Sequence, residues 1–212
     1  MRGRTSSAGL QLMWAALAIS IVLGLAGLFL DISLRQRLLQ REGAIAQEFL
    51  ESIVRSEKIG PALFANSSRA AELTRFADHV VAFQGTFRAT IYSLDGFIRH
   101  STEPNLVGIK FHDNEELQQA IEGALVVNLE SNVDKSEQLG LSQLAGDSLI
   151  ETYIPVHDGE GRMIAVVEYY KQPDAFFATV AAGRRDMAAT LALAALALFA
   201  FAVMAQRKAV GS

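Results

Sequence analysis

Four short runs in the middle of the chain alternate hydrophobic with polar residues. They cover residues 87–93, 97–102, 149–156 and 163–170. Asp95-Gly96 joins the first two runs, and a two-residue Asp-Gly connection is the strongest short-range signal for a β-hairpin. A second turn sequence, residues 158–161, joins the last two runs. The pattern therefore predicts two hairpins of one antiparallel sheet.

Before these runs, apolar residues recur at helical spacing from Asp31 to about Glu57. Asp31 is expected to cap this helix and Gly60-Pro61 to end it. The apolar stripe is wide enough for two neighbours, and it consists of Leu34, Leu38, Leu39, Ile45, Ala46, Phe49, Leu50 and Ile53. We expect one neighbour to be the sheet of the same chain, and the other to be the same helix of a second copy in a parallel dimer stalk.

Two shorter helices are predicted on either side of the first hairpin. One begins at Ser67 or Ser68 and runs to Phe83. The other begins at Asp113, whose carboxylate is expected to cap it while Glu116 returns the bond three residues later. Both helices carry apolar residues on one face and therefore pack against the sheet.

The remaining segments complete the fold. Residues 125–129 are predicted to form a central strand, and residues 131–147 a polar loop long enough to act as a lid. The order of elements indicates an α+β fold with a five-stranded antiparallel sheet. The N-terminal helices are expected to cover one face, while the short helix and the loops close over the other and leave a concavity that suits a small ligand.

Two segments near the ends of the chain, 9–30 and 187–205, contain no charged residue. About 19 to 22 helical residues cross the roughly 30 Å hydrocarbon core of a membrane, so both segments are predicted to be transmembrane helices. A cleaved signal peptide is the alternative for the first segment, because Arg2 and Arg4 would form its charged region. Its apolar run is long for a signal peptide, and no small-x-small cleavage site follows before Asp31, so the anchor is preferred.

Basic residues bear on the orientation. Arg2 and Arg4 precede the first segment, and Arg207 and Lys208 follow the second, which favours both ends in the cytoplasm. Further arginines lie at the opposite ends of both segments, so a local count alone gives no majority. The predicted parts are a cytoplasmic tail 1–8, a span 9–30, a stalk 31–84, a sheet domain 85–172, a connector 173–186, a span 187–205 and a tail 206–212.

Composition narrows the function classes. The net charge of −4 is spread over both signs, which predicts no nucleic-acid surface. The chain has no cysteine, which excludes disulfides, thiolate metal sites and cysteine nucleophiles. Paired carboxylates, phosphate loops and nucleophile elbows at catalytic spacing are not visible, so we expect no enzyme activity and no cofactor.

Several segments together resemble the single Cache family, the PAS-like extracytoplasmic sensor domains of bacterial membrane receptors, histidine kinases and diguanylate cyclases. The matching segments are 91–96 (IYSLDG), 100–108 (HSTEPNLVG), 151–156 (ETYIPV) and 166–170 (VVEYY). The resemblance covers roughly residues 31–175. It implies a two-pass protein of the bacterial inner membrane, in which residues 31–186 lie outside the cytoplasm and bind a small ligand.

One position departs from the carboxylate-sensing members that this hairpin resembles. Those relatives carry a histidine just before the proline-rich loop, where Ser101 stands here, with His100 one step away and directed to the other sheet face. This departure weakens the prediction that the ligand is a carboxylate. Arg88 and Arg99 would still supply positive charge to one.

Strand alternation selects the candidate ligand-binding residues. Arg88 and Tyr92 share one face of their predicted strand, while the apolar residues between them face the core. Tyrosines are favoured for lining a pocket because each offers an aromatic face and a hydroxyl group. The alternative for each polar side chain is ordinary packing or an edge turned to solvent. The candidates are Arg88, Tyr92, Arg99, Ser101, Tyr153 and Tyr169.

A metal site is not predicted. His112, Asp113 and Glu116 lie close in sequence, but helix capping explains the two acids and the preceding loop explains the histidine. The chain is thus expected to be a membrane-anchored sensory input module, acting as a homodimer, that binds a small polar or anionic molecule beside Tyr153 and Tyr169. A non-sensing tethered domain that binds another envelope protein is the alternative, which a filled interior with an exposed apolar patch would favour.

Overall fold

The computed structural model describes residues 4–65, 69–83, 85–111, 113–130 and 148–210. The serines expected to cap the second helix, His112 and the lid predicted for residues 131–147 lie outside these ranges. The chain divides into two compact units. One is Arg37–Ala175, and the other combines Met1–Gln36 with Phe176–Ser212.

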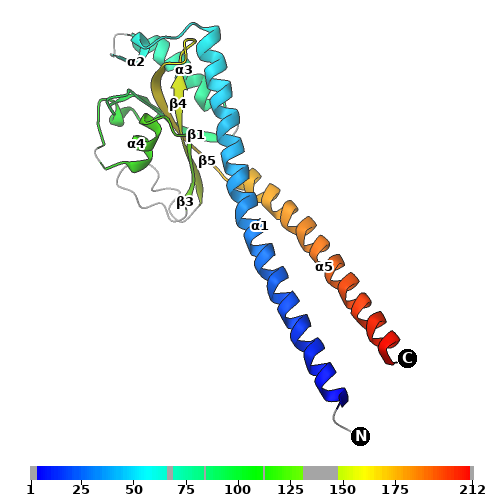
Figure 1. Ribbon diagram of the computed structural model, residues 1–212. Coiled ribbons are helices and arrows are strands. Elements are labelled where there is room, and N and C mark those ends of the chain that lie inside the picture. The colour runs from blue at the N-terminus through cyan, green and yellow to red at the C-terminus, as the bar shows by residue number, and fades with distance from the viewer. Residues whose placement is uncertain (1–3, 66–68, 84, 112, 131–147, 211–212) are drawn as a thin grey trace. The chain divides into compact units, whose positions relative to one another are not determined.

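A five-stranded sheet forms the centre of the first unit (Figure 1). Its strands are β1 Thr86–Tyr92, β2 Ile98–Ser101, β3 Val126–Glu130, β4 Leu149–His157 and β5 Met163–Lys171. They are arranged in the order β2-β1-β5-β4-β3, and every neighbouring pair is antiparallel. The predicted mixed α+β fold and five-stranded antiparallel sheet are therefore confirmed.

The position of β3 differs from the prediction. It forms an edge of the sheet and pairs with β4 alone, so the expectation of a central strand is wrong. Its sequence is mainly apolar, but only Val127 is fully buried. A short edge strand whose residues are mostly half-buried gives nearly the same sequence pattern as a short central strand, which explains the error.

The two hairpins form where the turn residues predict them. Gly96 lies between β1 and β2 with φ +83°, a left-handed conformation that a residue with a side chain rarely adopts. Its N–H donates to Ser93 O at 2.9 Å, and Ser93 N–H donates to Phe97 O at 3.0 Å. Residues 158–162 likewise reverse the chain between β4 and β5, because Asp158 N–H donates to Arg162 O at 2.9 Å.

Helices cover one face of the sheet. They are α1 Arg4–Ser56, α2 Ala62–Ala65 and α3 Ala70–Val81. Within the first unit, Ala46 and Leu50 of α1 and Phe76 of α3 are buried in the main core, which includes Ile91 of β1 and Val167 of β5. One row of the predicted α1 stripe therefore packs on the sheet of its own chain.

The second row of the stripe does not take part in that core. Ile45 is 51% exposed and Phe49 is 37% exposed. Phe49 contacts the ring of Phe83 with centroids 5.5 Å apart. The second neighbour expected for this row, another copy of the helix, stays a prediction.

The opposite face of the sheet is covered by the short helices η2 Pro104–Leu106 and α4 Glu115–Ile121. Leu106, Leu117 and Ala120 pack there against Tyr153 and Val166. The cap of α4 differs from the prediction. Asn114, and not Asp113, occupies the capping position, because its Oδ1 accepts from Leu117 N–H at 2.6 Å.

The second unit contains the first part of α1 and α5, a continuous helix from Asp174 to Val210. Asp31 and Arg184 form a two-bond ion pair, with oxygen–nitrogen distances of 2.6 and 2.7 Å. Close packing supports the same pairing of helices, since a Cβ added at Gly27 would lie 3.3 Å from Leu191 Cδ1.

Large apolar side chains of this unit are exposed, among them Phe29 at 70% and Phe199 at 69%. By length and composition, one helix in the described part of the chain, counted from Leu17 to Ser56, is able to cross a membrane. The second predicted span lies within α5 and stays a prediction.

Candidate functional site

A buried group of polar residues lies on the sheet face that α4 covers. It consists of Tyr92 of β1, Glu151 and Tyr153 of β4, Glu168 and Tyr170 of β5, and Asn114 at the start of α4, and we call it the tyrosine–glutamate cluster. Residues two apart on a strand point to the same face, which brings each glutamate beside a tyrosine of its own strand.

The strand register brings the two pairs together. Glu151 lies opposite Tyr170, and Tyr153 lies opposite Glu168. The Glu-x-Tyr sequence of β4 is therefore matched by the Glu-x-Tyr sequence of β5 running in the opposite direction. All four side chains are almost completely buried, with exposures between 1% and 3%.

Hydrogen bonds connect the whole cluster. The Tyr170 hydroxyl lies 2.7 Å from Glu151 Oε1 and 2.7 Å from Glu168 Oε1. Tyr92 donates to Glu168 Oε2 at 2.9 Å, and Tyr153 donates to Glu151 Oε1 at 3.0 Å. Asn114 Nδ2 donates to the Tyr153 hydroxyl at 2.9 Å, so the cluster joins α4 to the sheet.

Burial governs the electrostatics of the cluster. It raises the pKa of Glu168 above its ordinary value, and the nearby charge of Glu151 raises this pKa further. The hydrogen bonds that Glu168 makes with Tyr170 and Tyr92 and the charge of Arg88 oppose the shift. Burial also raises the pKa of Tyr153 and that of Tyr170, so both hydroxyls keep their protons and act as donors.

Arg88 lies beside the cluster on β1. Its guanidinium carbon is 5.4 Å from the centroid of the Tyr170 ring, a distance at which a cation is attracted by an aromatic face. Only 3% of the residue is exposed. Arg88 therefore supplies a buried positive charge, which favours the ionised form of Glu168.

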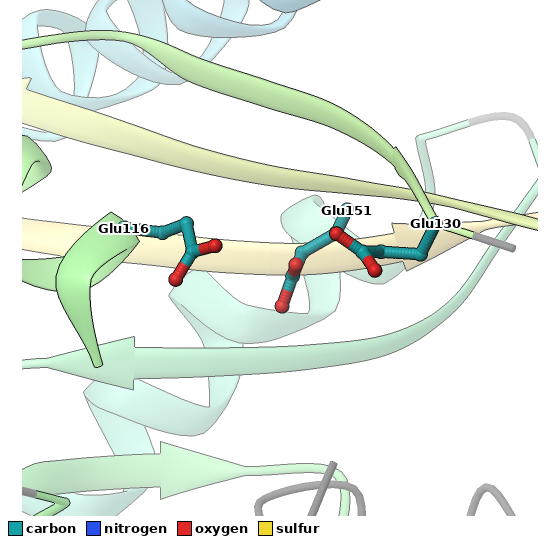
Figure 2. Close-up of side chains that lie close together, drawn as sticks. All are labelled: Glu116, Glu130 and Glu151. Atoms are coloured by element: carbon teal, nitrogen blue, oxygen red, sulfur yellow. The ribbon is translucent and has the colours of Figure 1, made fainter. Parts of the chain in front are cut away.

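Two further acids approach the cluster from its rim. Figure 2 shows Glu116 of α4 and Glu130 of β3 close to Glu151. One carboxylate oxygen of each of the three residues lies within 4.8 Å of those of the other two. Oxygen ligands of this type suit hard cations such as Ca²⁺ and Mg²⁺. Acidic groups commonly gather without binding an ion, so the three carboxylates by themselves do not define a metal site.

An open groove of about 700 Å³ lies between α4 and the β1–β2 hairpin. Its lining includes Leu94, Asp95, Gly96, Lys110, Phe111, Asp113, Asn114, Glu115, Leu117, Gln118 and Ile121. Asn114 belongs both to this lining and to the tyrosine–glutamate cluster. A molecule in the groove would therefore contact the residue that holds α4 on the sheet.

The structure places the six predicted site residues in different surroundings. Tyr92 and Tyr153 belong to the cluster, and Arg88 lies beside it. Ser101 is buried on β2, where its hydroxyl lies 3.3 Å from that of Thr90. Arg99 lies at the hairpin, where its Nε donates to Ser93 Oγ at 3.0 Å, and thus outside the cluster.

Tyr169 lies on the opposite face of the sheet. It is buried in the core beneath α1 and α3, with its ring centroid 6.2 Å from that of Phe83. Burial raises the pKa of its hydroxyl to about 12. The expectation that Tyr153 and Tyr169 line one concavity is therefore wrong, because Tyr169 pairs with Thr152 while Tyr153 pairs with Glu168.

Sequence reasoning missed Glu151, Glu168, Tyr170 and Asn114. A usable signal was present for the first three, because Glu-x-Tyr occurs at residues 151–153 and again at 168–170, in the two strands of one predicted hairpin. Asn114 offered a weaker signal, since it competes with Asp113 as the cap of α4. Its bond to Tyr153 depends on tertiary packing and has no sequence signature.

Comparisons with known proteins give partial structural likenesses. No protein-family model and no curated protein matches the chain. An extracellular ligand binding receptor from Desulfohalobium retbaense DSM5692 is similar over 71% of this chain, with 16% identity and a TM-score of 0.42. The chain spans 26% of the length of that receptor.

The E. coli DcuS sensor domain is similar over 67% of this chain and 98% of its own length, with 12% identity and a TM-score of 0.33. A C-terminal domain from Streptococcus mutans is similar over 50% of this chain and 89% of its own, with 18% identity and a TM-score of 0.33. At these values the likenesses carry no argument about function.

Proposed function

We propose that the chain is a membrane-anchored sensory input module, which binds a small extracytoplasmic ligand and passes a conformational signal across the membrane. The resemblance to sensor domains of histidine kinases and diguanylate cyclases supports this assignment. The proposal gives the chain two membrane passes, an inner-membrane location in a bacterium and no catalytic step of its own.

One observation carries the proposal: β4 and β5 bear the tyrosine–glutamate cluster on one face and contact the stalk on the other. Gln47 Nε2 of α1 donates to Pro155 O of β4 at 3.0 Å. Lys171 at the end of β5 forms an ion pair with Glu42 of α1. A shift of these strands on the ligand side would therefore reach the stalk directly.

The charges favour a ligand with a positive group. Asp95, Asp113 and Glu115 line the groove against Lys110. Glu116, Glu130 and Glu151 add carboxylates at the rim of the cluster. This revises the expected polar or anionic ligand to a small polar molecule that carries an amine, because unlike charges attract and like charges disfavour binding.

Thermal shift measurements on the full chain in lipid nanodiscs test the proposal. We would use a panel of primary amines, quaternary ammonium compounds, amino acids and dicarboxylates. A ligand that binds only the folded state raises the melting temperature by mass action. A shift with an amine, absent with dicarboxylates, would support the proposal, whereas no shift with any member would contradict it.

Asn114→Ser is the variant to compare. It keeps a neutral side-chain oxygen that can cap α4 but loses the Nδ2 donor to Tyr153, so the helix start is preserved while the link to the cluster is cut. Gln119→Ala on the exposed side of α4 is the matched control. We expect the ligand-induced shift to disappear in Asn114→Ser and to persist in the control.

We also propose that the module works as a homodimer. The exposed Ile45 and Phe49 of α1 recur four residues apart and would pack against the same row of a second copy. Cysteines placed at Ile45 should crosslink in membranes. Absence of crosslinking there and at Ala188 of α5 would contradict a dimer.

The second candidate, a tethered domain that binds another envelope protein, is favoured by a different observation. Leu94, Phe97, Val107 and Ile109, which lie at the β1–β2 hairpin and the loop after η2, are 37% to 47% exposed. If Phe97→Ser and Ile109→Ser abolish function while every thermal shift is absent, this candidate replaces the sensor.

A further inference from the structure

The hydrogen atoms of the tyrosine–glutamate cluster can be assigned by following its bonds from the backbone. Leu117 N–H donates to Asn114 Oδ1, so Asn114 presents Nδ2 to the Tyr153 hydroxyl. Tyr153 accepts that bond and donates its own proton to Glu151 Oε1 at 3.0 Å. Glu151 is therefore an acceptor in the cluster.

The contact between Tyr170 and two glutamates needs one more proton. Its hydroxyl lies 2.7 Å from an oxygen of Glu151 and 2.7 Å from an oxygen of Glu168. A phenol has one proton to donate and can accept a bond at its oxygen. With the phenol donating to Glu151, the bond to Glu168 requires a proton on Glu168 Oε1.

The remaining oxygen of Glu168 fits this arrangement. Oε2 accepts from the Tyr92 hydroxyl at 2.9 Å, as the carbonyl oxygen of a carboxylic acid does. Glu168 is 3% exposed, and an ionised carboxylate at such a position costs free energy unless it is paired. A neutral Glu168 leaves one buried negative charge beside Arg88 in place of two.

We propose that Glu168 carries a proton in the folded protein at neutral pH, that it donates this proton to the Tyr170 hydroxyl, and that loss of the proton loosens α4 from the sheet. Ionisation would place two negative carboxylates on one phenol. The strain would fall on the link from Glu151 through Tyr153 to Asn114, which is the link that holds α4.

Charged groups near the cluster lie on β1, β4, α4 and β3. Arg88 of β1 favours the ionised form of Glu168, and the charge of Glu151 of β4 disfavours it. Glu116 of α4 and Glu130 of β3 lie close to Glu151. The helix η2, which also packs on this face through Leu106, carries no charged residue. Burial is the largest cause of the raised pKa of Glu168. The assignment of a proton to Glu168 does not depend on the sensory function. Only a role for this proton as a pH input rests on the function proposed above.

The sign of the pH effect follows from linkage. A glutamate whose pKa is higher in the folded state than in the unfolded state holds its proton more tightly when folded. Its contribution to stability is fully present below the ordinary pKa of 4.5 and is lost as the pH rises through the raised pKa of the folded protein. The cluster therefore weakens on the alkaline side.

Infrared spectroscopy of the full chain in nanodiscs tests the proton directly. A protonated carboxyl group has a C=O stretch distinct from that of a carboxylate. We expect this band at neutral pH in the wild type and in Glu116→Gln, and its loss in Glu168→Gln. An unchanged band in Glu168→Gln, or its loss only in Glu151→Gln, would overturn the assignment.

Glu168→Gln should fold, because its amide can donate to Tyr170 while its oxygen accepts from Tyr92. Hydrogen exchange of the α4 amides then tests the loosening. At about pH 5 the wild type and Glu168→Gln should exchange alike, and at about pH 9 the wild type should exchange several-fold faster than the variant at the same pH. Equal exchange at both pH values would contradict the loosening.

The wild type alone keeps the proposal testable if the variant does not fold. Its infrared band and its α4 protection should then disappear over the same pH interval. A failure of ligand binding leaves these results unchanged, so the two proposals fail separately.

Discussion

Arg184 and Asp31 face each other in a two-bond ion pair that ties α5 to α1, 153 residues apart in sequence. The bond to Arg184 lowers the pKa of Asp31, so the carboxylate stays ionised at neutral pH. Two-bond pairs between an arginine and a carboxylate fix geometry as well as charge. This pair therefore fixes the distance between α1 and α5 at the level of Asp31 and Arg184.

We predict that Arg184→Glu separates the two helices at this level and that Asp31→Arg in the same chain restores their approach. Disulfide crosslinking between cysteines at Gly27 and Leu191 measures the separation. Arg185→Glu is the matched control, because that arginine donates to Ala181 O and not to Asp31. Equal crosslinking in all variants would show that the ion pair does not position the helices.

Gly43 gives a packing prediction. A Cβ added there would lie 2.6 Å from Val127 Cγ2 of β3, which is too close for a real contact. Glycine to alanine in a helix normally stabilises by about 1 kcal/mol, but here we expect a net loss of about 1 to 3 kcal/mol from overpacking. Chemical denaturation of Gly43→Ala measures it.

Val127→Ala should rescue Gly43→Ala at least in part, because it removes the clashing methyl group. Gly24→Ala is the control, since nothing lies within 4 Å of a Cβ added at that helical glycine. Additive losses in the double variant would contradict the proposed contact.

Tyr170→Phe should destabilise the first unit more than Tyr169→Phe. The first change removes the hydroxyl shared by two buried glutamates and should lower the free energy of unfolding by about 1 to 3 kcal/mol. The Tyr169 hydroxyl lies on the other sheet face, outside the cluster. Equal losses in the two variants would argue against a cluster that stabilises the fold.

The hydrogen bonds of Asp158 predict that the protein loses stability at acidic pH. It accepts from Glu160 N–H and from the backbone and side chain of Arg162, and these bonds lower its pKa below 3.8. Its contribution is therefore present above the unfolded pKa and is lost as the pH falls through the lower folded value. Asp158→Asn should have a lower melting temperature than the wild type at neutral pH. On acidification, its melting temperature should fall less than that of the wild type.

The continuity of α5 predicts how a signal leaves the sheet. The helix runs from Asp174 to Val210, so a proline at Ala182 removes one helical hydrogen bond and bends it. We expect Ala182→Pro to leave the ligand-induced thermal shift unchanged while removing any ligand-dependent crosslinking at Ala188. Survival of that dependence would contradict transmission through α5.

The sequence was sufficient for the elements of the fold and insufficient for part of the site. Asp95-Gly96 predicted the first hairpin because its turn chemistry is local. Asn114 as the cap of α4 and the edge position of β3 depend on packing between distant segments, which a single sequence does not specify. Tyr169 was assigned to the site because it is a tyrosine, although its place in the strand alternation directs it to the other core.

The Glu-x-Tyr sequences of β4 and β5 create a local two-fold axis between paired, antiparallel strands. The axis passes between Thr152 and Tyr169, and it exchanges Glu151 with Glu168 and Tyr153 with Tyr170. Strand geometry alone would therefore make the two glutamates equivalent. Two neighbouring residues break that equivalence. Asn114 donates a hydrogen bond to Tyr153, and Tyr92 donates one to Glu168. The asymmetry of the site therefore comes from residues outside the hairpin.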